Sequence, residues 1–285
     1  MKNIIGYSFI KILFEIKNLL YFLSSGITGG MMNKEKIAIS ISQEILDMLD
    51  SKIDGHLIRN RSQAIEFFIE KGLKDYIIDK AVILLSKEHQ KYALKEINGK
   101  PLIKHQIDFF IKYNVMNIFI LTQHTEKVNE MMDVIGNSEA NVRIFEKEVK
   151  GNAKALDFIN EKLKGNSFIV MSGDTYNEFD LTKMIEKHLV ADKLITMGLM
   201  SRDKPDEYGA VILDGDMIID FKEKDKKADS HIVNAGIYIF KPEVLNFIGE
   251  KADSLEKDVF PAIAKVNQLV GFFTHGKYIH VSEER

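Results

Sequence analysis

Hydrophobic residues follow two different periods along the chain. Residues 36–42 alternate, with isoleucine at every second position, and this pattern predicts a β-strand. Two helical patterns follow, over 43–53 and 62–74. We expect Asp54-Gly55 to end the first helix and Ser62 to cap the second, because these residue types favour such positions.

Each of the two predicted helices carries one apolar stripe, which we expect to be buried. The stripes comprise Ile45, Leu46, Leu49 and Ile53 in the first helix, and Ala64, Ile65, Phe68, Ile69 and Leu73 in the second. One strand and two short helices cannot enclose a core. We therefore expect a second copy of the chain to supply a partner strand, which makes the protein a homodimer.

From Lys80 onward, short apolar runs alternate with longer amphipathic segments, and this alternation predicts repeated βα units around a mostly parallel, doubly wound sheet. After Tyr208 the pattern becomes β-rich, with a hairpin turn at Asp214-Gly215. The predicted strands lie at 81–85, 117–121, 142–145, 168–171, 194–199, 210–213, 217–221 and 233–240, and the predicted helices at 101–113, 126–135, 153–163 and 181–189.

Composition limits the possible functions. The chain has 285 residues, of which 45% are hydrophobic and 28% charged, a size that favours two domains in an ordinary soluble protein. It contains no cysteine, so disulfides and thiolate metal sites are excluded, and we expect a cytoplasmic location. The formal net charge of -3 offers no global attraction for nucleic acid, so any DNA binding must come from a local module.

Residues 1–32 form a separate apolar leader. Charged residues interrupt its apolar run, which makes a membrane-spanning helix a weak interpretation, although an interfacial amphipathic helix fits. Gly29-Gly30 directly precede Met31-Met32, as expected when a purine-rich ribosome-binding sequence is read in frame. We therefore favour a translation start at Met31 or Met32 over a membrane anchor.

The segment from 33 to 76 resembles the ribbon-helix-helix DNA-binding proteins, on the strand-helix-helix pattern and the sequence R-S-Q-A-I that begins at Arg61. The resemblance implies that two strands of a dimer enter the major groove and that residues 34–74 bind DNA. The DNA-binding residues would then be Lys36, Ala38 and Ser40 at base edges, with Arg59, Arg61 and the backbone N–H groups of Ser62 and Gln63 on phosphates.

The charges of this segment nearly cancel, with seven basic residues against eight acidic between Lys34 and Asp75. The alternative is therefore a segment that serves only for dimerisation.

The segment from 77 to 285 carries an ordered series of motifs. These are A-V-I-L at Ala81, N-G-K-P-L-I at Asn98, F-I-V-M-S-G-D at Phe168, E-Y-G-A-V at Glu207, F-K-E-K at Phe221, V-N-A-G-I-Y-I-F at Val233 and S-L-E-K-D-V-F-P at Ser254. The series resembles the sugar-phosphate nucleotidyltransferases, which join an NTP to a sugar 1-phosphate and release pyrophosphate. This implies a GT-A-like fold with a Rossmann-like mixed sheet.

The same resemblance implies the roles of individual residues. Asp174, at the end of a strand, would be a catalytic residue and a ligand of Mg²⁺. The substrate-binding residues would be Gly209, beside the sugar; Glu223, on its hydroxyls; Lys224, on its phosphate; and Asn234 and Gly236 close by.

The residues that correspond to the triphosphate-binding segments of the family depart from its pattern. Where the family has a glycine-rich loop with an arginine, Ser86–Glu96 has neither, so the backbone cradle for phosphates is lost. Lys91 or Lys95 is the candidate replacement for a lost cation, and the alternative is that these lysines are solvated. His280 stands where the family has a second metal-binding aspartate, and imidazole is a poorer ligand for Mg²⁺ than a carboxylate.

Three functions compete on these grounds. We favour a DNA-binding transcriptional regulator whose nucleotidyltransferase-like domain binds a sugar phosphate or nucleotide. The alternative is an active sugar-1-phosphate nucleotidyltransferase that dimerises through the ribbon-helix-helix segment. A scaffold without ligand or activity ranks last, because it leaves the retained motifs unexplained.

Overall fold

The computed structural model describes residues 38–225, 230–248, 252–273 and 277–281. The chain divides into two compact units, Met1–Ile77 and Ile78–Arg285. The apolar leader, the two candidate start methionines and Lys36 lie outside the described residues. In the described part of the chain, no helix combines the length and the apolar character that crossing a membrane requires.

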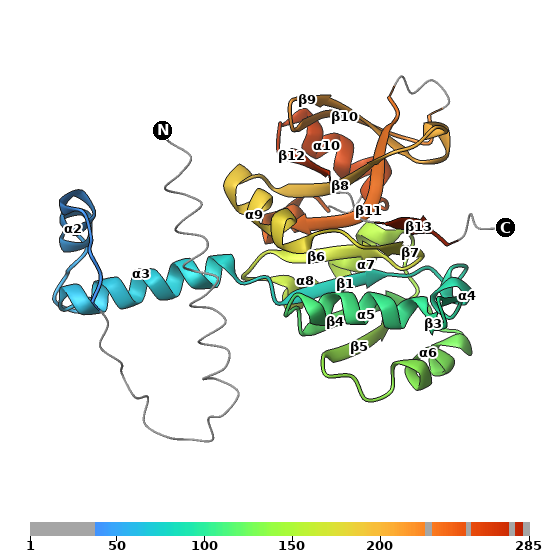
Figure 1. Cartoon of the computed structure of the whole chain (residues 1–285), viewed down its shortest axis with the longest axis horizontal. Helices are drawn as coiled ribbons and strands as arrows, with labels where there is room; N and C mark the ends of the chain where they lie inside the picture. Colours follow the sequence, from blue (N-terminus) through green and yellow to red (C-terminus); the bar gives the residue numbers. More distant parts are fainter. Residues whose placement is uncertain (1–37, 226–229, 249–251, 274–276, 282–285) are drawn as a thin grey trace. The chain divides into compact units, whose positions relative to one another are not determined.

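Over its described residues, 38–77, the first unit contains the helices α2 (Gln43–Asp50) and α3 (Arg61–Tyr76) (Figure 1). Ser42 caps α2 by accepting a hydrogen bond from the backbone N–H of Ile45. The helix ends at Asp50, earlier than predicted. Asp54 instead organises the connecting loop, because its carboxylate accepts hydrogen bonds from the backbone N–H groups of three following residues at 2.8 to 3.0 Å.

The start of α3 corrects the prediction that Ser62 is its cap. The side chain of Asn60 accepts a hydrogen bond from the backbone N–H of Gln63 at 3.0 Å, and Ser62 lies inside the first turn. One of the two N–H groups predicted to hold a DNA phosphate is therefore already bonded. The guanidinium of Arg61 pairs with the carboxylate of Asp50 at 2.5 and 2.7 Å.

Of the eight described residues of the two apolar stripes, one is buried, four are half-buried and three are exposed, whereas burial was predicted. Ala64 is buried, whereas the exposed fraction is 52% for Ile45, 36% for Phe68 and 42% for Ile69. Residues 38–42, which include Ala38 and Ser40, form no strand. Both differences have one physical reason: a strand needs a partner backbone and a stripe needs a second surface, and a single chain provides neither.

The second unit is a nine-stranded mixed sheet in the order β5-β4-β1-β6-β11-β8-β12-β10-β9, accompanied by two small two-stranded sheets. The strands are β1 (Lys80–Leu84), β2 (Glu96–Ile97), β3 (Lys100–Pro101), β4 (Asn117–Thr122), β5 (Asn141–Glu146), β6 (Phe168–Ser172), β7 (Thr175–Asn177), β8 (Ile195–Ser201), β9 (Gly209–Asp214), β10 (Met217–Glu223), β11 (Ile232–Phe240), β12 (Leu269–Phe273) and β13 (Tyr278–His280). The βα alternation predicted from Lys80 onward is thus present.

Helices cover both faces of the large sheet (Figure 1). One face packs against α5 (Leu102–Lys112), α6 (Lys127–Ile135) and α9 (Leu181–Ala191). The other face packs against α7 (Asn152–Phe158), α8 (Asn160–Leu163), η3 (Leu255–Val259) and α10 (Phe260–Lys265). The remaining helical segments are α4 (Gln90–Ala93), η1 (Pro205–Glu207) and η2 (Pro242–Phe247).

The antiparallel strand β11 makes the sheet mixed, because it lies between the parallel pair β1–β6 and the parallel pair β8–β12. The carboxyl ends of β1, β4, β5 and β6 consequently share one edge. The hairpin of β9 and β10 adds a second group of strands to the same sheet. Ligands bind at the carboxyl ends of strands in such sheets, so this edge is where a site is expected.

Candidate functional site

A pocket of about 910 Å³ opens at the carboxyl ends of β1, β4, β5 and β6. The residues lining it include all but one of the predicted catalytic, metal-binding and substrate-binding residues, namely Asp174, Gly209, Glu223, Lys224, Asn234, Gly236 and His280. Lys91 is not in the lining, and its ammonium lies 4.8 Å from the ring centre of Tyr92. Lys91, a candidate replacement for the cation of the lost loop, is therefore not part of the pocket.

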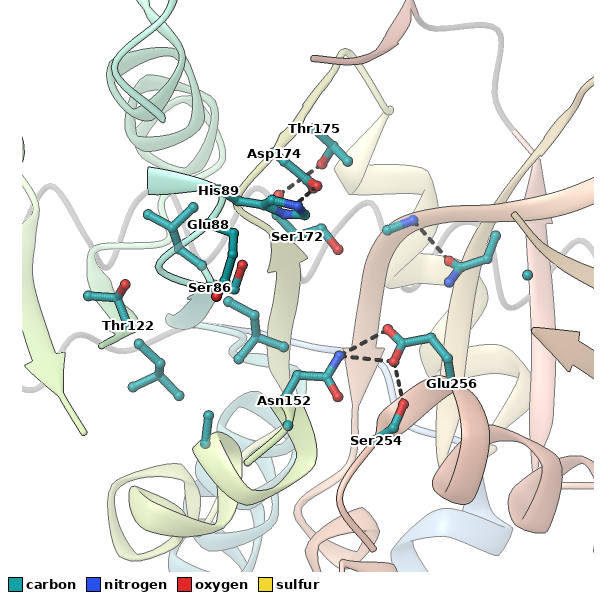
Figure 2. A pocket seen from close by; sticks show the side chains of 18 of the residues that line it. Ser86, Glu88, His89, Thr122, Asn152, Ser172, Asp174, Thr175, Ser254 and Glu256 are labelled. Carbon is teal, nitrogen blue, oxygen red and sulfur yellow. Dashed lines mark hydrogen bonds and ion pairs between the residues drawn. The ribbon is translucent and has the colours of Figure 1, made fainter. Parts of the chain in front are cut away.

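Asp174 stands in the turn between β6 and β7 and is 6% exposed. Its carboxylate oxygen Oδ2 lies 2.8 Å from Nδ1 of His89 (Figure 2). The same oxygen lies 3.6 Å from Nε2 of His280. The preceding residue is closely packed, because a Cβ on Gly173 would lie 2.9 Å from Cβ of Leu85 and 3.1 Å from the backbone oxygen of Leu84. Three distant segments thus meet at one carboxylate.

The two imidazoles keep Asp174 ionised. Burial raises the pKa of this carboxyl, but the hydrogen bond from His89 and the charges of both histidines outweigh burial and lower the pKa below its usual value. In the same pair, the hydrogen bond to Asp174 raises the pKa of His89, although partial burial opposes the rise. Both shifts favour a carboxylate on Asp174 and a protonated imidazole on His89.

The donor set around Asp174 does not fit a resident Mg²⁺ ion. Magnesium requires a near-octahedral shell of oxygen atoms, whereas the neighbours here are one carboxylate and two imidazoles. No group of three or more His, Cys, Asp and Glu side chains among the described residues is arranged to hold a metal. Both histidines contact the same oxygen of Asp174, Oδ2, so a magnesium ion that arrived with substrate phosphates would compete with them at that oxygen.

The loop that replaces the family's glycine-rich loop is firmly anchored. Gln90 is fully buried, and its amide nitrogen donates hydrogen bonds to the side chain of Thr122 at 2.8 Å and to the backbone oxygen of Gln123 at 2.7 Å. The backbone N–H of Lys87 donates to the side chain of Gln123 at 2.7 Å. These contacts fix the position of His89, which the sequence analysis did not single out.

Glu223 and Lys224 lie at the end of β10, on the side of the pocket formed by β9, β10 and β11. Burial, followed by the charge of Glu256, raises the pKa of Glu223. Lys224 has a positive φ of 49°, an uncommon backbone conformation for a residue other than glycine. Gly209 lies close to Glu223. A Cβ on Gly209 would lie 2.9 Å from the carboxylate of Glu223 and 2.4 Å from the ring of Phe221.

Asn234 is fixed by two hydrogen bonds. Its side-chain nitrogen donates to the hydroxyl of Tyr238 at 2.7 Å, and its oxygen accepts from the backbone N–H of Gly236 at 2.9 Å. Gly236 has a φ of +67°, which glycine adopts most readily. The predicted substrate-binding residues are therefore held in defined positions, although their roles stay predictions.

Two further pocket residues were missed by the sequence analysis. The carboxylate of Glu256 accepts hydrogen bonds from the amide of Asn152 at 3.0 Å and from the hydroxyl of Ser254 at 2.9 Å (Figure 2). The oxygen of Asn152 accepts in turn from the backbone N–H of Leu255 at 2.8 Å. Glu256 belongs to the motif that begins at Ser254, and Asn152 belongs to the segment G-N-A-K-A that begins at Gly151. Neither segment reveals that the two side chains meet.

Comparison with known proteins agrees with this architecture. The family model described as "Nucleotidyl transferase" matches residues 82–278, and the chain belongs to this family. The crystal structure of HddC from Yersinia pseudotuberculosis has a TM-score of 0.60 and 21% identity over 72% of this chain and 94% of that one. A UDP-glucose pyrophosphorylase complexed with UDP-glucose has a TM-score of 0.62 and 16% identity over 73% of this chain and 94% of that one.

The curated relatives include proteins named as mannose-1-phosphate guanylyltransferases. The catalytic subunit beta from Xenopus tropicalis is 28% identical over 199 residues, which are 67% of this chain and 55% of the relative. The enzyme from Saccharomyces cerevisiae is 27% identical over 202 residues, again 67% of this chain and 55% of the relative. The chain spans about half the length of these relatives. The predicted nucleotidyltransferase unit is confirmed, whereas the ribbon-helix-helix unit stays a prediction.

Proposed function

We propose that the unit Ile78–Arg285 catalyses the transfer of a nucleotidyl group from an NTP to a sugar 1-phosphate. A phosphate oxygen of the sugar 1-phosphate attacks the α-phosphorus of the NTP, and pyrophosphate leaves. The observation that carries this proposal is the convergence of Asp174, Glu223, Lys224 and Asn234, from separate elements, on one pocket of a nucleotidyl transferase domain. The sequence analysis gave this function as the alternative and favoured a DNA-binding regulator.

The arrangement of side chains suggests how the substrates are held. The ammonium of Lys224 would bind the phosphate of the sugar 1-phosphate, and the carboxylate of Glu223 would accept hydrogen bonds from its hydroxyls. Positioning and charge stabilisation supply most of the rate in phosphoryl-type transfers. Because the curated relatives are named for mannose 1-phosphate and guanylyl transfer, mannose 1-phosphate and GTP are the first substrates to test.

The test is pyrophosphate release from each NTP with a panel of sugar 1-phosphates, with and without Mg²⁺. Lys224→Ala is expected to raise the KM for the sugar 1-phosphate about 10- to 100-fold, the effect of losing one charge-assisted hydrogen bond. Lys222→Ala is the matched control, because Lys222 lies two residues earlier, on β10, and outside the pocket lining. No release with any pair of substrates, or equal KM values in the two variants, would contradict the proposal.

A second candidate function is DNA binding by a dimer of the first unit, coupled to ligand binding in the second. It is favoured by the exposed apolar side chains of that unit, among them Ile39, Met48 and Phe67, at 53%, 64% and 48% exposure. Light scattering should then give a mass of about twice 32.6 kDa at micromolar concentration.

DNA from upstream of the gene should bind the dimer with a strong salt dependence. The double variant Lys36→Ala, Arg61→Ala should weaken that binding. A monomer, or unchanged binding by the double variant, would remove this candidate.

A further inference from the structure

The loop from Ser86 to Ala93 cannot cradle a phosphate with its backbone. The backbone N–H of Lys87 donates to the side chain of Gln123 at 2.7 Å, and the backbone N–H of His89 donates to the backbone oxygen of Ser86 at 2.9 Å. The protein itself therefore uses backbone N–H groups that a glycine-rich loop would offer to a ligand. An incoming phosphate would also meet the negative charge of Glu88, which lines the pocket.

The pocket as a whole is poor in cations. Its lining contains five carboxylates, from Glu88, Asp174, Glu207, Glu223 and Glu256, against two lysines, Lys147 and Lys224. A phosphate group entering this pocket needs cationic donors. The two histidines at Asp174 are the remaining groups that can provide them.

Of these two histidines, His89 is the better placed. Its Nδ1 is committed to Asp174 at 2.8 Å, which leaves Nε2, on the other side of the ring, as the nitrogen available to a ligand. His89 lines the pocket and is half-buried. Lys224 lines the same pocket, and its positive charge opposes protonation of the His89 imidazole. A phosphate that enters this pocket would meet both cationic side chains.

We infer that His89, oriented through Nδ1 by Asp174, binds the phosphate group of the substrate through Nε2, together with Lys224. The inference rests on the proposed function, and it adds a second cation beside Lys224 for the phosphate of the sugar 1-phosphate. It assigns Asp174 the task of orienting an imidazole, as carboxylates do for histidines in other active sites. Phosphate binding by this site therefore does not require a divalent metal.

The opposing explanation is that His89 only holds the loop in place through its contact with Asp174. Two substitutions separate the possibilities. In His89→Asn the side-chain amide can still donate to Asp174, but no nitrogen remains at the position of Nε2. In His89→Gln the amide nitrogen reaches further and can replace Nε2 instead. A purely structural role should be preserved by asparagine, whereas phosphate binding should be preserved better by glutamine.

The experiment is a titration of the full chain with mannose 1-phosphate, monitored by ³¹P NMR and by calorimetry. It is carried out once in EDTA and once in Mg²⁺. We expect the parent to bind in EDTA, His89→Asn to bind about 10- to 100-fold more weakly, and His89→Gln to lie between them. The control is His124→Asn, because His124 also pairs with a carboxylate, Glu146 at 2.5 Å, but is absent from the pocket lining.

Equal affinity of His89→Asn and the parent would overturn the inference while leaving the proposed function intact. Binding by the parent only in Mg²⁺ would also overturn it, because a metal would then be the phosphate partner. If neither mannose 1-phosphate nor any other sugar 1-phosphate of the panel binds the parent, the proposed function fails and the inference fails with it.

Discussion

Asp174→Asn is expected to lower the rate of pyrophosphate release at least about 100-fold without unfolding the protein. Removing one preorganised electrostatic contact from an active site typically costs about 10²–10³ in rate. Here the carboxylate is buried and carries the contacts to both His89 and His280. Asparagine has nearly the same shape, so the packing is kept while the negative charge that orients His89 is lost.

The control for this substitution is Asp133→Asn, on the exposed surface of α6 and outside the pocket lining. It makes the same chemical change, and its rate should equal that of the parent. Steady-state rates and thermal unfolding of both variants separate loss of chemistry from loss of fold. Equal pyrophosphate release by Asp174→Asn and the parent would mean that the activity belongs to a contaminant or that Asp174 has no part in it.

Gly151→Ala is expected to destabilise the larger unit by about 2–6 kcal/mol. Gly151 has φ +85° and ψ 161°, a conformation that is essentially restricted to glycine and costs about 1–3 kcal/mol for other residues. A Cβ would also lie 2.0 Å from the backbone oxygen of Asp253. Relieving such overlap in a packed region typically costs about 1–3 kcal/mol more.

The same substitution should damage the pocket. The backbone oxygen of Asp253 accepts a hydrogen bond from the N–H of Ala153, and the adjacent Asn152 holds Glu256. Moving the segment that contains Asp253 would therefore disturb one pocket wall.

Urea unfolding of Gly151→Ala should be compared with Gly165→Ala. Gly165 also has a positive φ, of 99°, but a Cβ there meets nothing within 4 Å. The control thus carries the conformational cost without the overlap. Equal stability of the two variants would show that the contact with Asp253 relaxes freely.

Much of the larger unit could be predicted because its signals are local. Apolar runs such as 81–85 and 168–171 predicted strands, and the amphipathic period of 101–113 predicted a helix; all three elements are present. Asp174 was placed at a strand end for the same reason. The caps were less predictable, because Asn60 and Ser62 are both good capping residues and only the backbone hydrogen bonds decide between them.

The pairing of strands was harder to predict. No local pattern in the sequence of β11 predicts that this strand lies antiparallel between β6 and β8. The later part of the chain, from η3 to β13, also contains elements that no clear hydrophobic period predicted. Strand order depends on which apolar faces pack together over the whole sheet, and this is a property of the complete chain rather than of a segment.

The sequence by itself determined the α/β class of the larger unit, the position of the carboxylate Asp174 at a strand end and the loss of the glycine-rich loop. These follow from periodicity, turn chemistry and residue type, which act over a few neighbours. Only the tertiary structure decided that His89 meets Asp174, and that Asn152 holds Glu256 from 104 positions away. Such contacts depend on the strand order that places the ends of β1 and β6 side by side. For that reason the residue types near the site were predictable, but the contacts between their side chains were not.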